Sequence, residues 1–234
     1  AEYAYGSVEK VEVNGDLKQV ITDSETYEAP VVIIATGSQY RKLGVEGEAE
    51  YAGRGVSYCA VCDGAFFKDQ PVAVIGGGDS AVEEGVYLAK LASNVNIIHR
   101  RDQLRAQKIL QERAFANDKI DFTWDTVVTK INGDGQKVTS VSTHNKKTGE
   151  DGELKVNGVF IYVGVIPLSE PFKELGITDE QGWIKTDELM QTSLPGVYAI
   201  GDVRAKELRQ ITTAVGDGSI AGQQAFNYLE SLKD

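Results

Sequence analysis

Apolar and polar residues alternate along the first 23 residues of the chain, which is the pattern of a half-buried β-strand. Residues 3–13 and 17–23 flank the turn sequence Asn14-Gly15-Asp16, so this stretch predicts a β-hairpin. The apolar run 29–37 follows after a short polar link and ends at glycine. A continuous apolar run of this kind predicts a strand that is buried on both faces.

The same order of patterns recurs later in the chain. Residues 122–131 and 137–145 flank a second turn at 132–135, and the apolar run 154–164 again ends at glycine. The sequence therefore contains a diverged internal repeat, in which a β-meander precedes a buried strand.

Alternating strand and helix patterns precede only the second copy of this repeat. Strand 72–75, helix 80–91, strand 94–99 and helix 102–117 together predict a βαβ unit with a further helix. Since the repeat is otherwise symmetric, we expect an equivalent unit, about 30 residues or more in length, ahead of Ala1. The chain is then an N-terminally shortened piece of a larger protein with two nucleotide-binding domains.

The last part of the chain predicts a short strand at 183–186, a buried strand at 196–202 and an amphipathic helix at 211–232. This helix can cover the buried strand 29–37, which otherwise has no helical neighbour, so we expect the tail to fold with the N-terminal residues. The result is an α/β protein in which one domain is inserted into another. The predicted parts are 1–40 and 166–234 for the split domain, and 41–165 for the inserted domain.

Composition and charge narrow the class of protein. With 234 residues, 41% hydrophobic and 25% charged, the chain is an ordinary soluble globular protein with room for one large or two small domains. The net charge is −11 and no basic stripe with interleaved aromatic residues is present, so nucleic acid is not an expected partner. No apolar run is long enough to span a bilayer and no secretory signal is present, so we expect a cytosolic protein without a membrane partner.

The sequence from Gly76 to Ala81 fits the pattern G-x-G-x-x-G/A, in its proper place between a strand and a helix. The first glycine permits a tight turn, the second lets the backbone approach a pyrophosphate, and Ala81 permits close packing of helix on strand. The alternative is a tight strand–helix turn without a ligand. The flanking pattern favours a dinucleotide site.

Some 20 residues further on, an NAD site would present an acidic residue to the ribose 2′-hydroxyl. This chain presents His99, Arg100 and Arg101 instead, with Arg105 expected one helical turn later. Guanidinium groups bind phosphate bidentately, so the sequence favours NADPH over NADH. The alternative is a solvated basic helix start, which the helix dipole disfavours unless a phosphate is bound.

Cys59 and Cys62 are the only cysteines and have the spacing of a redox-active pair. The alternative is half of a zinc site, which would need two further ligands, and the chain offers only two histidines, His99 and His144. We therefore favour the redox interpretation. Asp63 follows directly, and is expected as a helix N-cap, as the acid that protonates a leaving thiolate, or as both.

Three further observations complete the candidate set. Gly201-Asp202 at a strand end, followed by residues 209–211 at a helix start, has the pattern of another ligand-facing junction. We expect His144 to be a solvated loop residue, and Trp124 and Trp183 to be packing residues.

These motifs resemble those of the low-molecular-weight thioredoxin reductases, over essentially the whole chain. The motif C-A-x-C-D-G inside a nucleotide-binding domain is highly specific. The resemblance implies two Rossmann-like domains of the pyridine nucleotide-disulfide reductase type, with the FAD domain incomplete at its N-terminus. It also implies a homodimer that passes electrons from NADPH through FAD to the cysteine pair and then to thioredoxin. The stretches that carry the resemblance are 35–37, 54–64, 74–84, 99–102 and 201–203.

Roles follow from the resemblance by matching position. Cys62 lies against the flavin, Cys59 attacks the thioredoxin disulfide, and Asp63 supplies the proton. Rotation of the inserted domain, with hinges at 41–47 and 165–168, lets the pair serve both. The implied NADPH residues are Gly76, Gly78, Ser80, His99, Arg100, Arg101 and Arg105. The implied FAD residues are Thr36, Gly37, Asp202, Arg209, Gln210 and Ile211.

Three alternatives stay open at this point. The flavoprotein subunit of a peroxide reductase system would share these motifs but carry additional N-terminal thioredoxin-like domains. A catalytically incompetent NADPH-binding fragment of a reductase would share them without turning over. A zinc module ranks last, because too few ligands are available.

Overall fold

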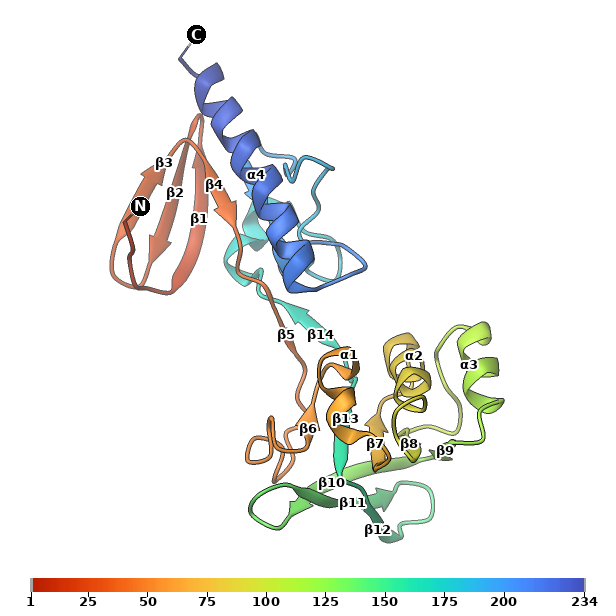
Figure 1. Cartoon of the computed structure of the whole chain (residues 1–234). Helices are drawn as coiled ribbons and strands as arrows, with labels where there is room; N and C mark the ends of the chain where they lie inside the picture. Colours follow the sequence, from red (N-terminus) through yellow and green to blue (C-terminus); the bar gives the residue numbers. More distant parts are fainter. Residues whose placement is uncertain (1, 234) are drawn as a thin grey trace. The chain divides into compact units, whose positions relative to one another are not determined.

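The chain divides into two units, which Figure 1 shows in a computed structural model that describes residues 2–233. The first, here the split unit, consists of Ala1–Gln39 and Val165–Asp234. The second, here the inserted unit, consists of Tyr40–Gly164. Each unit has its own hydrophobic core and is described by itself.

A five-stranded sheet forms the centre of the inserted unit, and every neighbouring pair in it is parallel. Its strands, in spatial order, are β6 (Val56–Ser57), β13 (Gly158–Ile161), β7 (Pro71–Ile75), β8 (Asn94–Ile98) and β9 (Ile120–Thr123). All five strands therefore end at the same edge of the sheet, where parallel α/β sheets bind their ligands.

Two different layers cover this sheet (Figure 1). One consists of the helices α2 (Asp79–Leu88) and α3 (Lys108–Phe115), and the other of the antiparallel strands β10 (Thr126–Gly133), β11 (Val138–Asn145) and β12 (Asp151–Lys155). Alternate residues of β7 divide between them: Val72 and Val74 pack with the helices, whereas Ala73 and Ile75 pack with the meander. Because both faces are covered, the central strands β7 and β13 contain no polar side chains.

The split unit repeats this plan with fewer elements. Its antiparallel meander is β1 (Val8–Asn14), β2 (Leu17–Thr22) and β3 (Thr26–Ala29), its parallel pair is β4 (Val32–Ile34) and β15 (Val197–Ala199), and its long helix is α4 (Ile211–Ser231). Ala199 faces a core that contains Val11 of the meander. Tyr198 faces Ala221 of α4 on the other side.

Shorter elements complete the two units. The strands β5 (Ser38–Tyr40) and β14 (Val165–Pro167) pair at the two points in the sequence where the chain passes from one unit to the other. The remaining short helices are α1 (Ala60–Asp63) and the 3₁₀ helices η1 (Gly64–Phe67), η2 (Glu170–Leu175) and η3 (Gly201–Val203). No helix among residues 2–233 is long and apolar enough to cross a membrane.

The predicted α/β fold is confirmed, but some of the predicted elements were wrong. The apolar run 154–164 contains the end of β12 and the whole of β13, which belong to two different sheets. The predicted strand 183–186 is absent, since Ile184 forms only isolated bridges.

The predicted helix 102–117 begins only at Lys108. The amides that would open it are used elsewhere: Arg105 N donates to Gly77 O at 2.6 Å, and Gln107 N donates to Asp79 Oδ1 at 2.7 Å. The segment is therefore held against the glycine-rich turn. Arg100, Arg101 and Arg105 therefore all precede the helix and do not form its first turn.

Candidate nucleotide and dithiol site

Four segments of the inserted unit follow parallel strands and meet at one edge of the sheet. Cys59 follows β6, Tyr162 follows β13, the turn 76–78 follows β7, and residues 99–101 follow β8. Only β13 separates β6 from β7, so the cysteine motif and the glycine-rich turn start about 10 Å apart, which is two strand spacings. The sheet order therefore makes neighbours of two motifs that the sequence only places in succession.

The glycine-rich turn leaves no room for side chains on the side of the sheet. Gly76 has φ 151°, and a Cβ there would lie 2.5 Å from the carbonyl oxygen of Tyr162. A Cβ on Gly77 would lie 2.4 Å from the His99 ring. Gly78, by contrast, has open space beside it and stands at the N-cap of α2 without a side-chain cap. The turn thus fits the close approach of a pyrophosphate to a helix N-terminus.

A pocket of about 390 Å³ opens beside this turn, and its walls are basic. It includes four of the seven residues predicted for NADPH, whereas Gly78, Ser80 and Arg101 are not among its lining residues. Sequence reasoning missed two basic residues of the wall. They are adjacent in the sequence at the predicted start of the inserted domain, and this pair of cations was the signal that could have indicated them. The predicted lining residues are Gly76, His99, Arg100 and Arg105, and the missed cations are Arg41 and Lys42.

His99 is buried at the floor of this basic pocket, with only 4% of its surface exposed. Its Nε2 is buried and has no hydrogen-bond partner among residues 2–233. Burial lowers the pKa of His99, and the positive charges of Arg105, Arg101 and Arg100 lower it further. The imidazole is therefore neutral at physiological pH and leaves an unsatisfied polar atom in the region where a ligand would bind.

The environment of His99 gives a direct prediction for its titration. In an NMR titration of the nucleotide-free protein, we expect the pKa of His99 to lie below the ordinary 6.5, because burial and three guanidinium groups disfavour the cation. As the pH falls below about 6.5, His99 binds a proton in the unfolded chain but not yet in the folded one, so acidification lowers the free energy of unfolding through this residue. His144 is the only other histidine, and His144→Gln assigns the signals. A His99 pKa above 6.5 would contradict this electrostatic description.

The two cysteines form a disulfide at the start of the short helix α1. Cys59 is the N-cap residue, and its Sγ accepts a hydrogen bond from Cys62 N at 3.2 Å. Cys59 is half-buried and Cys62 is exposed. In this form neither sulfur is the thiolate that a zinc site would require, and no cluster of three potential metal ligands occurs in the part of the chain that the structure describes.

Asp63 is the last residue of α1 and, as predicted, stands at the N-cap position of the following helix η1. Its side chain, however, makes no capping hydrogen bond to η1. Instead, the buried Ser57 donates from Oγ to Asp63 Oδ2 at 2.7 Å and accepts from Cys59 N at 3.1 Å. Ser57, which sequence reasoning missed, thereby fixes the carboxylate next to the cysteine motif.

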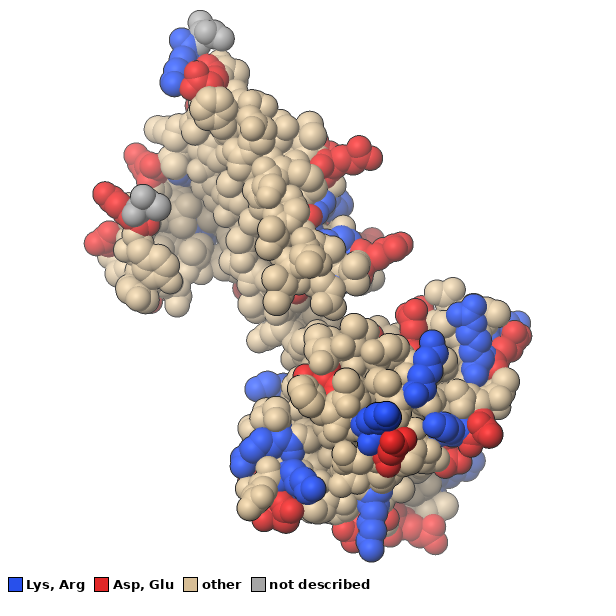
Figure 2. Space-filling view, viewed as in Figure 1, with Lys and Arg blue, Asp and Glu red and all other residues tan. Residues whose placement is uncertain are grey.

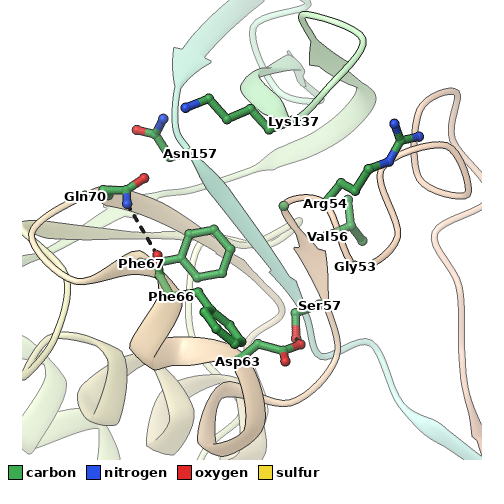
Figure 3. Close-up of a pocket in the computed structure, with 11 residues that line it drawn as sticks. Gly53, Arg54, Val56, Ser57, Asp63, Phe66, Phe67, Gln70, Lys137 and Asn157 are labelled. Carbon is green, nitrogen blue, oxygen red and sulfur yellow. Dashed lines mark hydrogen bonds between the residues drawn. The ribbon is translucent and has the colours of Figure 1, made fainter.

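A second pocket, of about 300 Å³, lies beside this carboxylate (Figure 3). Asp63 and Phe66 line one side of it, and Phe66 is 77% exposed. Arg54 and Lys137 add positive charge to other parts of the wall. An apolar ring and two cations thus border a hollow that Asp63, the residue after Cys62, also lines, and this combination suits a protein segment more than a small ion.

The residues predicted for FAD lie in the split unit, at the ends of two paired strands. Thr36 and Gly37 follow β4, and Asp202 follows β15. Since β4 and β15 are parallel, these residues share one edge. Gly37 has φ 73°, and Thr36 Oγ1 donates to Leu168 O at 2.6 Å. Asp202 Oδ1 is buried and has no partner within 2–233, which fits a ligand hydroxyl or amide there.

Arg209, Gln210 and Ile211 form the start of α4 at this edge. Arg209 donates from Nε to Asp202 O at 3.2 Å, and its guanidinium lies 3.7 Å above the centre of the Trp183 ring. Gln210 and Thr213 form a capping box, which defines where the helix begins. Ile211 is 84% exposed. The structure therefore brings Arg209 and Asp202 together and leaves an apolar side chain uncovered beside them.

Three residues outside these sites were also interpreted from sequence. Trp124 stacks on Phe122 with ring centres 5.1 Å apart, as expected of a packing residue. Trp183 supports Arg209, so it is a packing residue with a candidate ligand-binding neighbour. His144 is not in a loop: it lies on β11 and its Nδ1 is 2.8 Å from Asp151 Oδ1.

Comparison with known proteins gives consistent matches along the whole chain. The family model described as pyridine nucleotide-disulphide oxidoreductase matches residues 3–218. Thioredoxin reductases of Listeria innocua and Bacillus subtilis are 58% and 56% identical to the chain, over 100% of it and over 73% and 74% of those proteins. The crystal structure of thioredoxin reductase from Streptococcus pyogenes matches with 62% identity and a TM-score of 0.93, over 97% of this chain and 74% of that one. Thioredoxin reductase from Giardia duodenalis matches with 37% identity and a TM-score of 0.91, over 97% and 75%.

Proposed function

We infer from its membership of the thioredoxin reductases, within the pyridine nucleotide-disulphide oxidoreductase family, that this chain carries electrons from NADPH through FAD to Cys59–Cys62 and then to thioredoxin. The observation that carries this conclusion is the shared sheet edge in the inserted unit. There the disulfide and the basic pocket of the glycine-rich turn follow strands that only β13 separates.

The pocket of the inserted unit is the proposed NADPH site. The amides around Gly76–Gly78 would hold the pyrophosphate, next to the open space beside Gly78. Arg100 and Arg105, both in the pocket wall, would bind the 2′-phosphate, with Arg101 next to them in sequence. His99, neutral and with its Nε2 unsatisfied, would accept or donate one hydrogen bond to the nucleotide.

The edge formed by β4 and β15 is the proposed FAD site of the split unit. Asp202 would use its unpartnered Oδ1 toward the cofactor, and Arg209, stacked on Trp183, would hold the adjoining backbone in place. The amides near Gly37 and at the start of α4 would contribute the remaining contacts. Thr36, Gln210 and Ile211 complete this proposed set.

When bound, the two cofactors supply a hydride source and a carrier that delivers an electron pair to sulfur. The chain's own chemistry then follows thiol–disulfide exchange. With two electrons and two protons, the Cys59–Cys62 bond opens to two thiols. Cys59 gives its proton to Asp63, and the resulting thiolate attacks the partner's disulfide and forms a mixed disulfide. The partner's second sulfur leaves and takes that proton from Asp63. Cys62 then loses its proton and attacks Cys59 Sγ, which restores the intramolecular bond and releases the partner's first sulfur, and this sulfur takes up the proton to complete the reduced partner.

The pocket next to Asp63 is the proposed docking point for thioredoxin. Exposed Phe66 offers an apolar contact, and Arg54 and Lys137 offer cations, all beside the carboxylate that Ser57 orients (Figure 3). We further propose that residues 41–47 and 165–168 act as hinges for the inserted unit. The homodimer and the cytosolic location stay predictions.

The test is electron transfer by the purified holoenzyme with thioredoxin as acceptor. We expect one NADPH to be oxidised for each thioredoxin disulfide reduced. The absorbance of NADPH measures the first quantity, and alkylation of the thioredoxin thiols measures the second. NADH should support a much lower rate. If NADPH were oxidised without loss of the thioredoxin disulfide, while a peroxide-linked acceptor was reduced, the peroxide-system alternative would replace this proposal.

A further inference from the structure

The first backbone N–H groups of the helix α1 have partners that come from different parts of the inserted unit. Cys62 N donates to Cys59 Sγ at 3.2 Å, and Asp63 N donates to Cys59 O at 3.1 Å. Ala60 N donates to the hydroxyl of Tyr162 at 2.7 Å. Helix starts leave such donors without intrahelical partners, so this tyrosine caps the helix that carries the disulfide.

Tyr162 in turn contacts a carboxylate of the nucleotide-binding helix. Its hydroxyl lies 3.5 Å from Oε2 of Glu84, which belongs to α2. Burial raises the pKa of Glu84, whereas the Tyr162 hydroxyl and the amides of Ala60 and Val61 oppose that rise. Glu84 therefore faces the same end of α1 as Tyr162 does, in surroundings where a charge is poorly solvated.

The sheet order forces this arrangement. Tyr162 directly follows β13, the strand between β6 and β7, and its amide donates to Ile75 O at 2.8 Å. β6 leads to Cys59 and β7 leads through the glycine-rich turn to α2. A side chain at position 162 thus stands between the cysteine helix and the nucleotide helix, and Tyr162 also lines the basic pocket.

We propose that Glu84 and Tyr162 are positioning residues that hold the start of α1 and set the equilibrium between the disulfide and dithiol forms of Cys59–Cys62. This inference rests on the proposed function, in which that pair is the redox couple. Cys59 is the N-cap residue of α1, so the amides that follow it lie next to its sulfur in the chain and would stabilise a thiolate there. Tyr162 occupies the amide of Ala60, and the carboxylate of Glu84 beside that hydroxyl would disfavour a negative charge at this end of α1.

The equilibrium is measured on the full chain without nucleotide, in buffers of reduced and oxidised dithiothreitol at pH 8. Reduced dithiothreitol gives two electrons and two protons to the Cys59–Cys62 disulfide and closes to its own ring disulfide. Alkylation of free thiols and mass spectrometry give the reduced fraction. We expect Glu84→Gln to shift the exchange constant about fivefold toward the dithiol, because a nearby negative charge is removed while hydrogen bonding is retained.

Tyr162→Phe tests the capping contact separately. We expect the amide of Ala60 to exchange with deuterium about tenfold faster in the oxidised variant, because its buried acceptor is lost. Tyr87→Phe removes a hydroxyl from α2 and keeps the ring, and Glu112→Gln removes an exposed charge from α3. Neither control should change the exchange constant or the Ala60 amide.

The outcomes separate this inference from the function on which it rests. If the wild-type pair titrates with dithiothreitol but Glu84→Gln leaves the constant unchanged, Glu84 does not set the equilibrium. If Ala60 exchanges equally fast in Tyr162→Phe and in the wild type, the cap is not functional. If the wild-type pair is reduced by neither dithiothreitol nor NADPH, the proposed function itself fails.

Discussion

Replacement of Cys59 by serine is expected to abolish thioredoxin reduction, by about a thousandfold or more. A serine hydroxyl at this position can neither attack a disulfide sulfur nor form the bond to Cys62 that closes the cycle. The proposed NADPH site is a pocket of the same unit that no cysteine lines, so reduction of the flavin by NADPH should be unaffected. Flavin absorbance under anaerobic conditions, together with thiol release from thioredoxin, measures the two steps independently.

Cys62→Ser is the matched control for this experiment. It removes the resolving sulfur but keeps Cys59, so a mixed disulfide with thioredoxin should form once and persist. Mass spectrometry would detect it as a covalent complex that dithiothreitol cleaves. A complex trapped by Cys59→Ser instead would reverse the proposed roles of the two sulfurs. Sustained thioredoxin reduction by Cys59→Ser would refute the assignment altogether.

Removal of the guanidinium groups at Arg100 and Arg101 is expected to weaken NADPH binding about 100-fold and NADH binding only slightly. A charge-assisted bidentate contact to phosphate contributes about 1.5–3 kcal/mol, and only NADPH carries the 2′-phosphate. Arg100 lines the pocket and Arg101 does not, so Arg100→Ala should account for most of the loss. Calorimetry with NADP⁺ and NAD⁺ measures both affinities without turnover.

Arg113→Ala provides the comparison, because Arg113 is an exposed cation near the end of α3. It lowers the positive charge of the inserted unit by the same amount as either single variant. Basic side chains are numerous on the visible face of this unit, so a general charge effect has to be separated from a local one (Figure 2). Equal losses of NADP⁺ and NAD⁺ affinity in the Arg100 and Arg101 variants would remove the argument for the 2′-phosphate.

Several features of the fold could be predicted because they depend on local patterns. The alternation around Asn14-Gly15-Asp16 predicted the β1–β2 hairpin, and the apolar run before Gly76 predicted β7. The glycine spacing predicted a tight turn, in which a Cβ at Gly76 or Gly77 would clash, and the cysteine spacing predicted a pair close enough to bond. In each case, residues within one turn or one strand carry the information.

The predictions from sequence were wrong where a group can form a hydrogen bond either within its own segment or with a distant one. Residues 102–107 have an acceptable helical pattern, yet Arg105 donates its amide to the glycine-rich turn and Gln107 donates its amide to Asp79 at the start of α2. Asp63 stands at the N-cap position of η1, but Ser57 from β6 hydrogen-bonds its carboxylate, which therefore makes no capping bond. A local propensity of a fraction of a kcal/mol per residue is smaller than one well-placed hydrogen bond from a distant segment.

By itself, the sequence determined the α/β class, the two candidate nucleotide motifs and the chemistry of Cys59 and Cys62. Only the tertiary structure decided which of these motifs are neighbours. It placed β13 between β6 and β7, and with it Tyr162 against the start of α1 and Arg41 in the nucleotide pocket. The physical reason is that strand order follows from burying both faces of the sheet at once, a property of the whole unit that no local period encodes.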